Sequence, residues 1–66
     1  MFNFGHVYTH SRMLDMTIYV IRSFELPSGE YRIQARWVNR RGLDIGIVED
    51  FTIKPEEVRN WYLFSQ

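Results

Sequence analysis

The segment of residues 31–38 alternates apolar and polar side chains almost without error. Its apolar positions are Tyr31, Ile33, Ala35 and Trp37, and its polar positions are Arg32, Gln34 and Arg36. A period of two is typical of a strand with one face in the core. Short loops that end in Gly29 and Gly42 flank the segment on either side. The pattern therefore predicts a central antiparallel strand with a hairpin on each side and with Trp37 in the core.

The preceding segment, residues 16–26, predicts a second strand with a less regular pattern. Its middle, Ile18-Tyr19-Val20-Ile21, is apolar at both parities. A strand with one solvated face alternates, so two alternatives remain open for this one. Either both of its faces are covered, or a bulge moves the apolar side from one face to the other partway along the strand.

After Gly42, the alternation resumes with Leu43, Ile45 and Ile47. Both apolar sets occupy odd positions, so they share a face only if paired residue numbers have an even sum. A three-residue loop, 40–42, closed by Asn39 and Leu43, meets this condition and places Gly42 where a left-handed conformation is needed. This register predicts that Trp37 pairs with Ile45, Ala35 with Ile47, Arg36 with Gly46 and Arg32 with Asp50.

The remaining elements are short. Residues 5–10 predict a first strand, residues 48–50 interrupt the alternation, and residues 51–53 restore it briefly. Pro55 suits the first position of a helix, and the two glutamates after it suit the positive helix terminus, so residues 54–60 predict one helical turn. Residues 61–64 predict a last strand that pairs with the first. The whole pattern predicts one all-β domain over residues 1–66, with five to six antiparallel strands and one short helical turn before the last strand.

This order of elements resembles the SH3-like small β-barrel, a superfold that includes the SH3, Tudor, KOW and Sm-like domains. The resemblance is one of topology and spans residues 5–64. The acidic and aromatic peptide-binding motifs of true SH3 domains are absent, as is the glycine-rich loop motif of KOW domains, and an aromatic cage of the Tudor type cannot be traced. The resemblance implies a small closed barrel, and it implies no function, because this superfold hosts unrelated ones.

Composition narrows the class of protein. The chain has 66 residues, no cysteine, a net charge of zero and 17% aromatic residues, so an aromatic core rather than disulfides must stabilise it. No apolar run approaches the ~20 residues that cross a bilayer, and no signal peptide is recognisable at the start of the sequence. We expect a cytoplasmic protein without a membrane partner. Its small size would also fit an accessory protein of a phage or mobile element.

The candidates for catalysis or metal binding are few. His6 and His10 would lie roughly 13 Å apart on one strand face, too far to share a metal ion, and Asp15 supplies no third ligand. The carboxylates of Glu49-Asp50 and of Glu56-Glu57 are adjacent in sequence and therefore do not face each other. No serine lies in a Gly-x-Ser-x-Gly motif. We expect no enzyme activity, no cofactor and no metal site.

The remaining candidate is a binding surface. Seven of the eight basic residues are arginine, which favours planar and stacked contacts, and Lys54 is the only lysine. The candidate surface consists of Tyr8, Tyr19, Arg32, Arg36, Arg40, Arg41 and Tyr62, with Arg22 beside it. Asp44, Glu49 and Asp50 could pair with these arginines and leave an ordinary charged face.

Two functions fit such a surface. The first is a non-catalytic module that binds a protein partner or a second copy of itself as a homodimer, because tyrosine, tryptophan and arginine dominate protein interfaces. The alternative is a single-stranded nucleic-acid binder, in which arginines follow phosphates and aromatic rings stack on bases. Zero net charge favours the first function.

Overall fold

The computed structural model describes residues 2–13, 16–39 and 44–65. They form five antiparallel strands and one short helix: β1 (Val7–His10), β2 (Thr17–Glu25), β3 (Tyr31–Val38), β4 (Asp44–Ile53), α1 (Pro55–Val58) and β5 (Trp61–Ser65). The all-β class and the helical turn before the last strand are confirmed. Among the described residues no helix is long and apolar enough to cross a bilayer.

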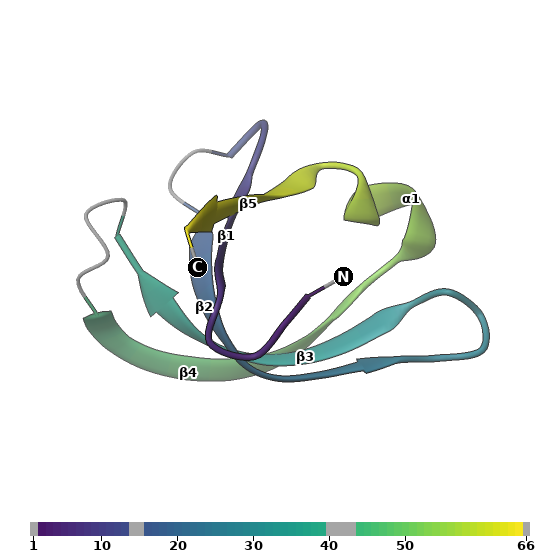
Figure 1. The fold of residues 1–66 in the computed structure, drawn as a ribbon, viewed down its shortest axis with the longest axis horizontal. Helices are drawn as coiled ribbons and strands as arrows, with labels where there is room; N and C mark the ends of the chain where they lie inside the picture. The colour runs from purple at the N-terminus through teal and green to yellow at the C-terminus, as the bar shows by residue number, and fades with distance from the viewer. Residues whose placement is uncertain (1, 14–15, 40–43, 66) are drawn as a thin grey trace.

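The strands form a single sheet in the order β4-β3-β2-β1-β5. The predicted pairing of the first and last strands is confirmed, because β1 and β5 are antiparallel neighbours. The sheet curls so that β3 and β4 lie across from β5 and α1, and the N-terminal segment lies inside the curve (Figure 1). The described ladders leave β4 and β5 as the two edges of the sheet.

The core lies on the concave face of this curled sheet. Its buried apolar residues are Phe2, Tyr8, Ile18, Val20, Ile33, Ala35, Ile53 and Trp61. The N-terminal segment reaches this face through a turn at Gly5, whose φ of +82° is accessible to glycine at little cost. The backbone N–H of Gly5 donates to the Val20 carbonyl at 2.9 Å, which ties the segment to β2.

Strand β2 contains the bulge that the apolar pattern left as one of two alternatives. Val20 pairs with Ala35, but Arg22 pairs with Gln34, so Ile21 is an extra residue. Before the bulge the odd-numbered residue Tyr19 shares the outer face with Arg36, and after it the even-numbered Arg22 shares that face with Gln34. The bulge therefore turns Arg22 and Phe24 outward; without it they would point into the core.

Strand β4 is one continuous strand, whereas the sequence predicted two segments separated by residues 48–50. Val38 pairs with Asp44 in the predicted register, but Arg36 then pairs with Val48 instead of Gly46. Gly46, with a φ of +86°, lies in the two-residue bulge that separates these pairs. Side chains alternate between the two faces with a period of two, so a shift of two residues leaves the paired residues beyond the bulge on their predicted faces. The alternation therefore did not reveal the shift.

This bulge makes three predicted pairs wrong. Ala35 pairs with Glu49 instead of Ile47, and Arg32 pairs with Thr52 instead of Asp50, which pairs with Gln34. Arg36 faces Val48, and Trp37 and Ile45 fall within the irregular segment. The predicted loop at residues 40–42 lies outside the described residues.

A pH-sensitive hydrogen bond joins the last residue of β2 to the first residue of β3, next to the turn between these strands. The Tyr31 hydroxyl donates to the Glu25 carboxylate at 2.9 Å. This hydrogen bond, followed by burial and by the carboxylate charge, raises the pKa of Tyr31 above its usual value of 10.0. Because the folded state holds the phenol proton more tightly than the unfolded state, this contribution to stability is present at neutral pH. It is lost as the pH rises through the raised pKa.

We expect Glu25→Gln to lower the pKa of Tyr31, because glutamine carries no charge that opposes ionisation of the phenol. Titration of the Tyr31 ring resonances by NMR measures this change. The matched control is Glu30→Gln on the same hairpin, because Glu30 accepts from Ser28 and not from Tyr31. An equal effect of the two substitutions would contradict the assignment to Glu25.

Candidate functional site

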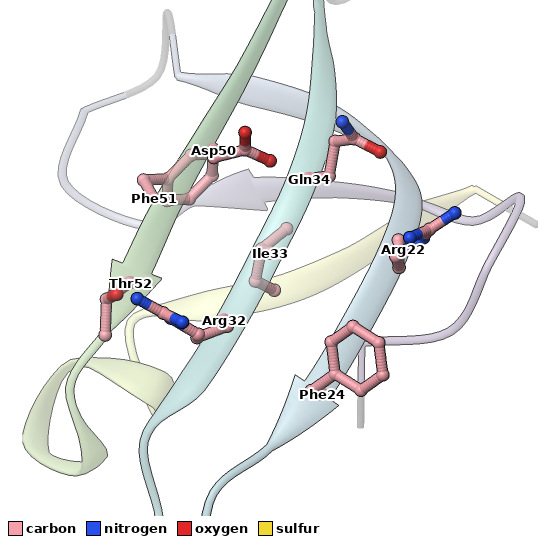
Figure 2. A pocket seen from close by; sticks show the side chains of 8 residues that line it. All are labelled: Arg22, Phe24, Arg32, Ile33, Gln34, Asp50, Phe51 and Thr52. Atoms are coloured by element: carbon pink, nitrogen blue, oxygen red, sulfur yellow. The ribbon is translucent and has the colours of Figure 1, made fainter.

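A groove of about 500 Å³ lies on the outer face of β2, β3 and β4. We call it the outer groove; Arg22, Phe24, Arg32, Ile33, Gln34, Asp50, Phe51 and Thr52 line it (Figure 2). Two rows of paired residues build it. Phe24, Arg32 and Thr52 form one row across the three strands, and Arg22, Gln34 and Asp50 form the other.

Phe24 is the main apolar group of the outer groove. It is 57% exposed, although phenylalanine is among the residues that are most often buried. Arg22 precedes it by two residues on β2, and Arg32 is its partner on β3. The arrangement combines an exposed ring with two guanidinium groups, a composition typical of sites that dominate binding energy in interfaces.

The arginines of the outer groove retain their charge for a partner. Neither Arg22 nor Arg32 forms an ion pair with a carboxylate of the described residues. Arg32 extends over the outer face toward Thr52, and Asp50 lies one row away, opposite Gln34 (Figure 2). The predicted pairing of Arg32 with Asp50 is therefore wrong, and the two-residue shift at Gly46 is the cause.

The structure separates the residues of the predicted surface. Arg32 and Arg36 lie on the outer face of β3, and Tyr19 lies beside Arg36 on β2. Tyr62 is exposed, but β1 and β2 lie between its strand and β3. Arg40 and Arg41 lie outside the described residues. The sequence therefore placed Arg32 and Arg36 on one face correctly. Tyr62 lies on a strand that is not adjacent to theirs.

Tyr8 does not belong to the surface. Its side chain is 3% exposed and lies in the concave core, where its hydroxyl accepts a hydrogen bond from the Asn3 backbone N–H at 2.9 Å. Its hydroxyl suggested a need for water or a ligand, but a backbone donor satisfies it instead. The assignment of Tyr8 to the surface was wrong because its hydrogen-bond partner, Asn3, belongs to the N-terminal segment. The path of that segment cannot be inferred from the alternation within the strands.

Phe24 is the residue that the sequence reasoning missed. The signal was present in the run of four apolar residues that end at Ile21. If the bulge there is accepted, the parity of β2 changes, and Phe24 shares the outer face with the arginines. With the bulge left undecided, the face of Phe24 stayed undecided as well.

His10 has a structural role. Its Nδ1 accepts hydrogen bonds from the backbone N–H groups of Arg12 and Met13, both at 3.1 Å. These two contacts fix the orientation of the ring and hold the chain that follows β1. Across the described residues, no three histidine, aspartate or glutamate side chains gather closely enough to hold a metal ion. Asp15 lies outside those residues.

Comparison with known proteins finds no relative of this chain. No protein-family model, no curated protein and no solved structure matches the chain. Function must therefore be argued from the geometry and the chemistry of the chain itself.

Proposed function

We propose that the protein is a non-catalytic binding module of the SH3-like small-barrel type that contacts a protein partner through the outer groove. The observation that carries this proposal is the exposed ring of Phe24 beside Arg22 and Arg32, neither of which is paired with a described carboxylate. Partners that present an apolar side chain next to acidic ones would satisfy all three groups. Charge-assisted hydrogen bonds from arginine to carboxylate are stronger than neutral ones and fix orientation.

The mixed lining of the outer groove favours a protein over a nucleic acid. Gln34 and Thr52 supply neutral donors and acceptors, which the backbone amides of a peptide can pair with. The net charge of the chain is zero, whereas nucleic-acid-binding domains usually carry an excess of positive charge. An extended peptide can place backbone amides, apolar groups and carboxylates along such a groove.

The edge of the sheet at β5 supports a protein partner as well. Tyr62, Leu63 and Phe64 are each more than two-fifths exposed, although all three are large and largely apolar. Among the strands that the structure describes, β5 has one neighbour, β1, so its other side is an edge to which a partner strand could be added. That strand could belong to a different protein or to a second copy of this chain, which would form a homodimer.

Single-stranded nucleic acid is the second candidate ligand, because Phe24 is an exposed ring close to two arginines, Arg22 on the same strand and Arg32 on β3. A base could stack on the ring while the guanidinium groups contact phosphates. Salt distinguishes the two ligands. Binding through phosphates weakens with added salt at a log–log slope of about −0.7 per neutralised phosphate, whereas an interface centred on Phe24 depends less on salt.

We expect the double substitution Arg22→Gln with Arg32→Gln to weaken binding of a short peptide that alternates glutamate with leucine by about tenfold or more, because it removes two charge-assisted contacts. NMR titration of the labelled protein measures the affinity and identifies the amides that shift. The matched control is Arg59→Gln, an exposed arginine after α1 that does not line the groove.

Three outcomes would contradict the protein-binding proposal. The double variant could bind the peptide as tightly as the wild type, or Arg59→Gln could lose as much affinity. The peptide could also fail to shift the groove amides while an oligothymidylate of similar length shifts them with a steep salt dependence, which would favour the nucleic-acid alternative.

A further inference from the structure

The edge of the sheet at β5 carries an exposed apolar surface. Tyr62, Leu63 and Phe64 follow one another on this strand, and each is more than two-fifths exposed. We call these three residues the β5 patch. Leu63 pairs with the buried Tyr8, so it belongs to the core side of the sheet, yet it is exposed because no described strand lies beyond β5. Contiguous exposed apolar side chains are typical of a surface that another molecule covers.

The β5 patch is separate from the outer groove. The groove lies over β2, β3 and β4, whereas β5 lies beyond β1 at the other edge of the sheet (Figure 1). The occupant of the β5 patch is therefore independent of the partner proposed for the groove, and neither site needs the other to be filled.

The two edges of the sheet differ in charge. β4 carries Glu49 and Asp50, both exposed, whereas β5 contains no charged residue. Like charges that face each other in a strand pair are destabilising, so two β4 edges would repel each other. Charged side chains on an edge strand are one means by which proteins prevent such pairing. Two β5 edges meet no such penalty, and the net charge of zero adds no repulsion between whole chains.

Symmetry also favours the pairing of β5 with itself. Pairing of β5 with β4 of another copy is heterologous and generates rings or open filaments. Antiparallel pairing of two β5 strands is isologous, so a two-fold axis relates the copies and the assembly closes as a dimer. An axis at Leu63 places this residue opposite Leu63 of the second copy and places Tyr62 opposite Phe64. Cross-strand pairs of aromatic and apolar side chains stabilise antiparallel sheets.

The size of the β5 patch sets the strength of such a contact. An aromatic side chain has roughly 150–250 Å² of surface, so the exposed part of Tyr62 or Phe64 is roughly 100 Å². Four such rings, two from each copy, supply about 400 Å², whereas stable interfaces bury about 1,200–2,000 Å². The added ladder is also short, because a bulge at Phe64 interrupts the regular pairing with β1 after Leu63. The contact is therefore weak.

We propose that a second copy of this chain covers the β5 patch, so that two sheets join through antiparallel β5 strands into a weak symmetric homodimer. Leu63 lies at the two-fold axis, and Tyr62 of each copy packs against Phe64 of the other. The dissociation constant should be roughly 10–500 μM, because the interface is smaller than those of stable complexes.

Sedimentation velocity at protein concentrations from about 5 μM to about 1 mM measures this association. We expect the wild type to change from monomer to dimer across this range. Leu63→Lys should remain a monomer, because two lysines would meet at the axis. The matched control is Val48→Lys on the other edge, because Val48 and Leu63 are both 43% exposed. It should dimerise as the wild type does, and circular dichroism checks that both variants fold.

Mixed variants test the symmetry of the dimer. Leu63→Glu alone should be a monomer, but an equimolar mixture with Leu63→Lys should associate, because glutamate then meets lysine at the axis. Leu63→Cys tests the same axis without a charge, since the chain has no cysteine of its own. A disulfide joins residues whose Cα atoms are about 4.4–6.8 Å apart, so mild oxidation should cross-link Leu63→Cys faster than Val48→Cys.

The proposal is overturned if the wild type is still a monomer at about 1 mM, or if Leu63→Lys and Val48→Lys weaken association equally. It is also overturned if the folded lysine and glutamate variants do not associate when mixed. If the charged variants do not fold, the cysteine variants decide: equal rates of cross-linking for Leu63→Cys and Val48→Cys exclude a two-fold axis at Leu63.

Discussion

Replacement of Phe2 with alanine is expected to unfold most of the protein at room temperature. Phe2 is 3% exposed and lies at the centre of the concave core. Its ring centroid is 4.9 Å from that of Tyr8, 5.1 Å from Tyr31 and 6.5 Å from Trp61, and all three contacts are edge-to-face. Loss of a buried phenylalanine costs about 3–5 kcal/mol. The single core of a domain of fewer than about 70–80 residues rarely supplies more than about 3–5 kcal/mol, so little stability would remain.

Urea unfolding followed by circular dichroism measures this effect. Phe4→Ala is the matched control, because Phe4 is two residues away and 73% exposed, and its midpoint should stay close to that of the wild type. Phe2→Leu should fall between the two alanine variants, because leucine fills part of the volume. A wild-type midpoint for Phe2→Ala would mean that the N-terminal segment does not pack into the curve of the sheet in solution.

Substitution of Thr9 or Thr17 by valine is expected to destabilise the fold by about 1–3 kcal/mol each, and the double substitution by much less than the sum. The two residues pair across β1 and β2, both are 0% exposed, and their hydroxyl oxygens are 3.0 Å apart. Either single substitution removes one partner and keeps the other hydroxyl buried. The double substitution removes both polar groups and preserves the shape of the side chains.

The two single variants should differ. In Thr17→Val the remaining Thr9 hydroxyl can still donate to the Met16 carbonyl at 3.4 Å, so its cost should lie at the lower end of the range. In Thr9→Val the Thr17 hydroxyl loses the one side-chain partner that the described residues give it. Free energies from urea unfolding of the four proteins form a double-mutant cycle. Strict additivity in that cycle would show that the two hydroxyls do not interact.

The strands themselves were predictable because they depend on local alternation. Tyr31–Val38 was predicted with its observed bounds, since apolar and polar residues alternate from Tyr31 to Trp37. The bulge in β2 was one of two predicted alternatives, because the apolar run at residues 18–21 conflicts with a period of two. The bulge at Gly46 went unnoticed because a shift by two residues leaves the alternation intact.

The candidate sites depended more on the folded arrangement. Arg32 and Arg36 were placed on a common face correctly, because both lie on the regular strand β3. Tyr8 was misplaced, because the Asn3 N–H that satisfies its hydroxyl is brought there by a turn and not by a strand. The stacking of Trp37 on Phe51 left no trace in the sequence, because the two rings come from β3 and β4 and the register between these strands was predicted incorrectly.

Local patterns were enough to predict the class of the fold, the positions of the strands, the helical turn and the pairing of the first strand with the last. Periodicity and turn chemistry are properties of neighbouring residues, so they can be read along the chain. The register of β4, the exposure of Phe24 beside Arg22 and Arg32, and the stacking of Trp37 on Phe51 emerged only in the folded molecule. Those features depend on two bulges and on the curl of the sheet, which bring distant residues together through the sum of many weak contacts.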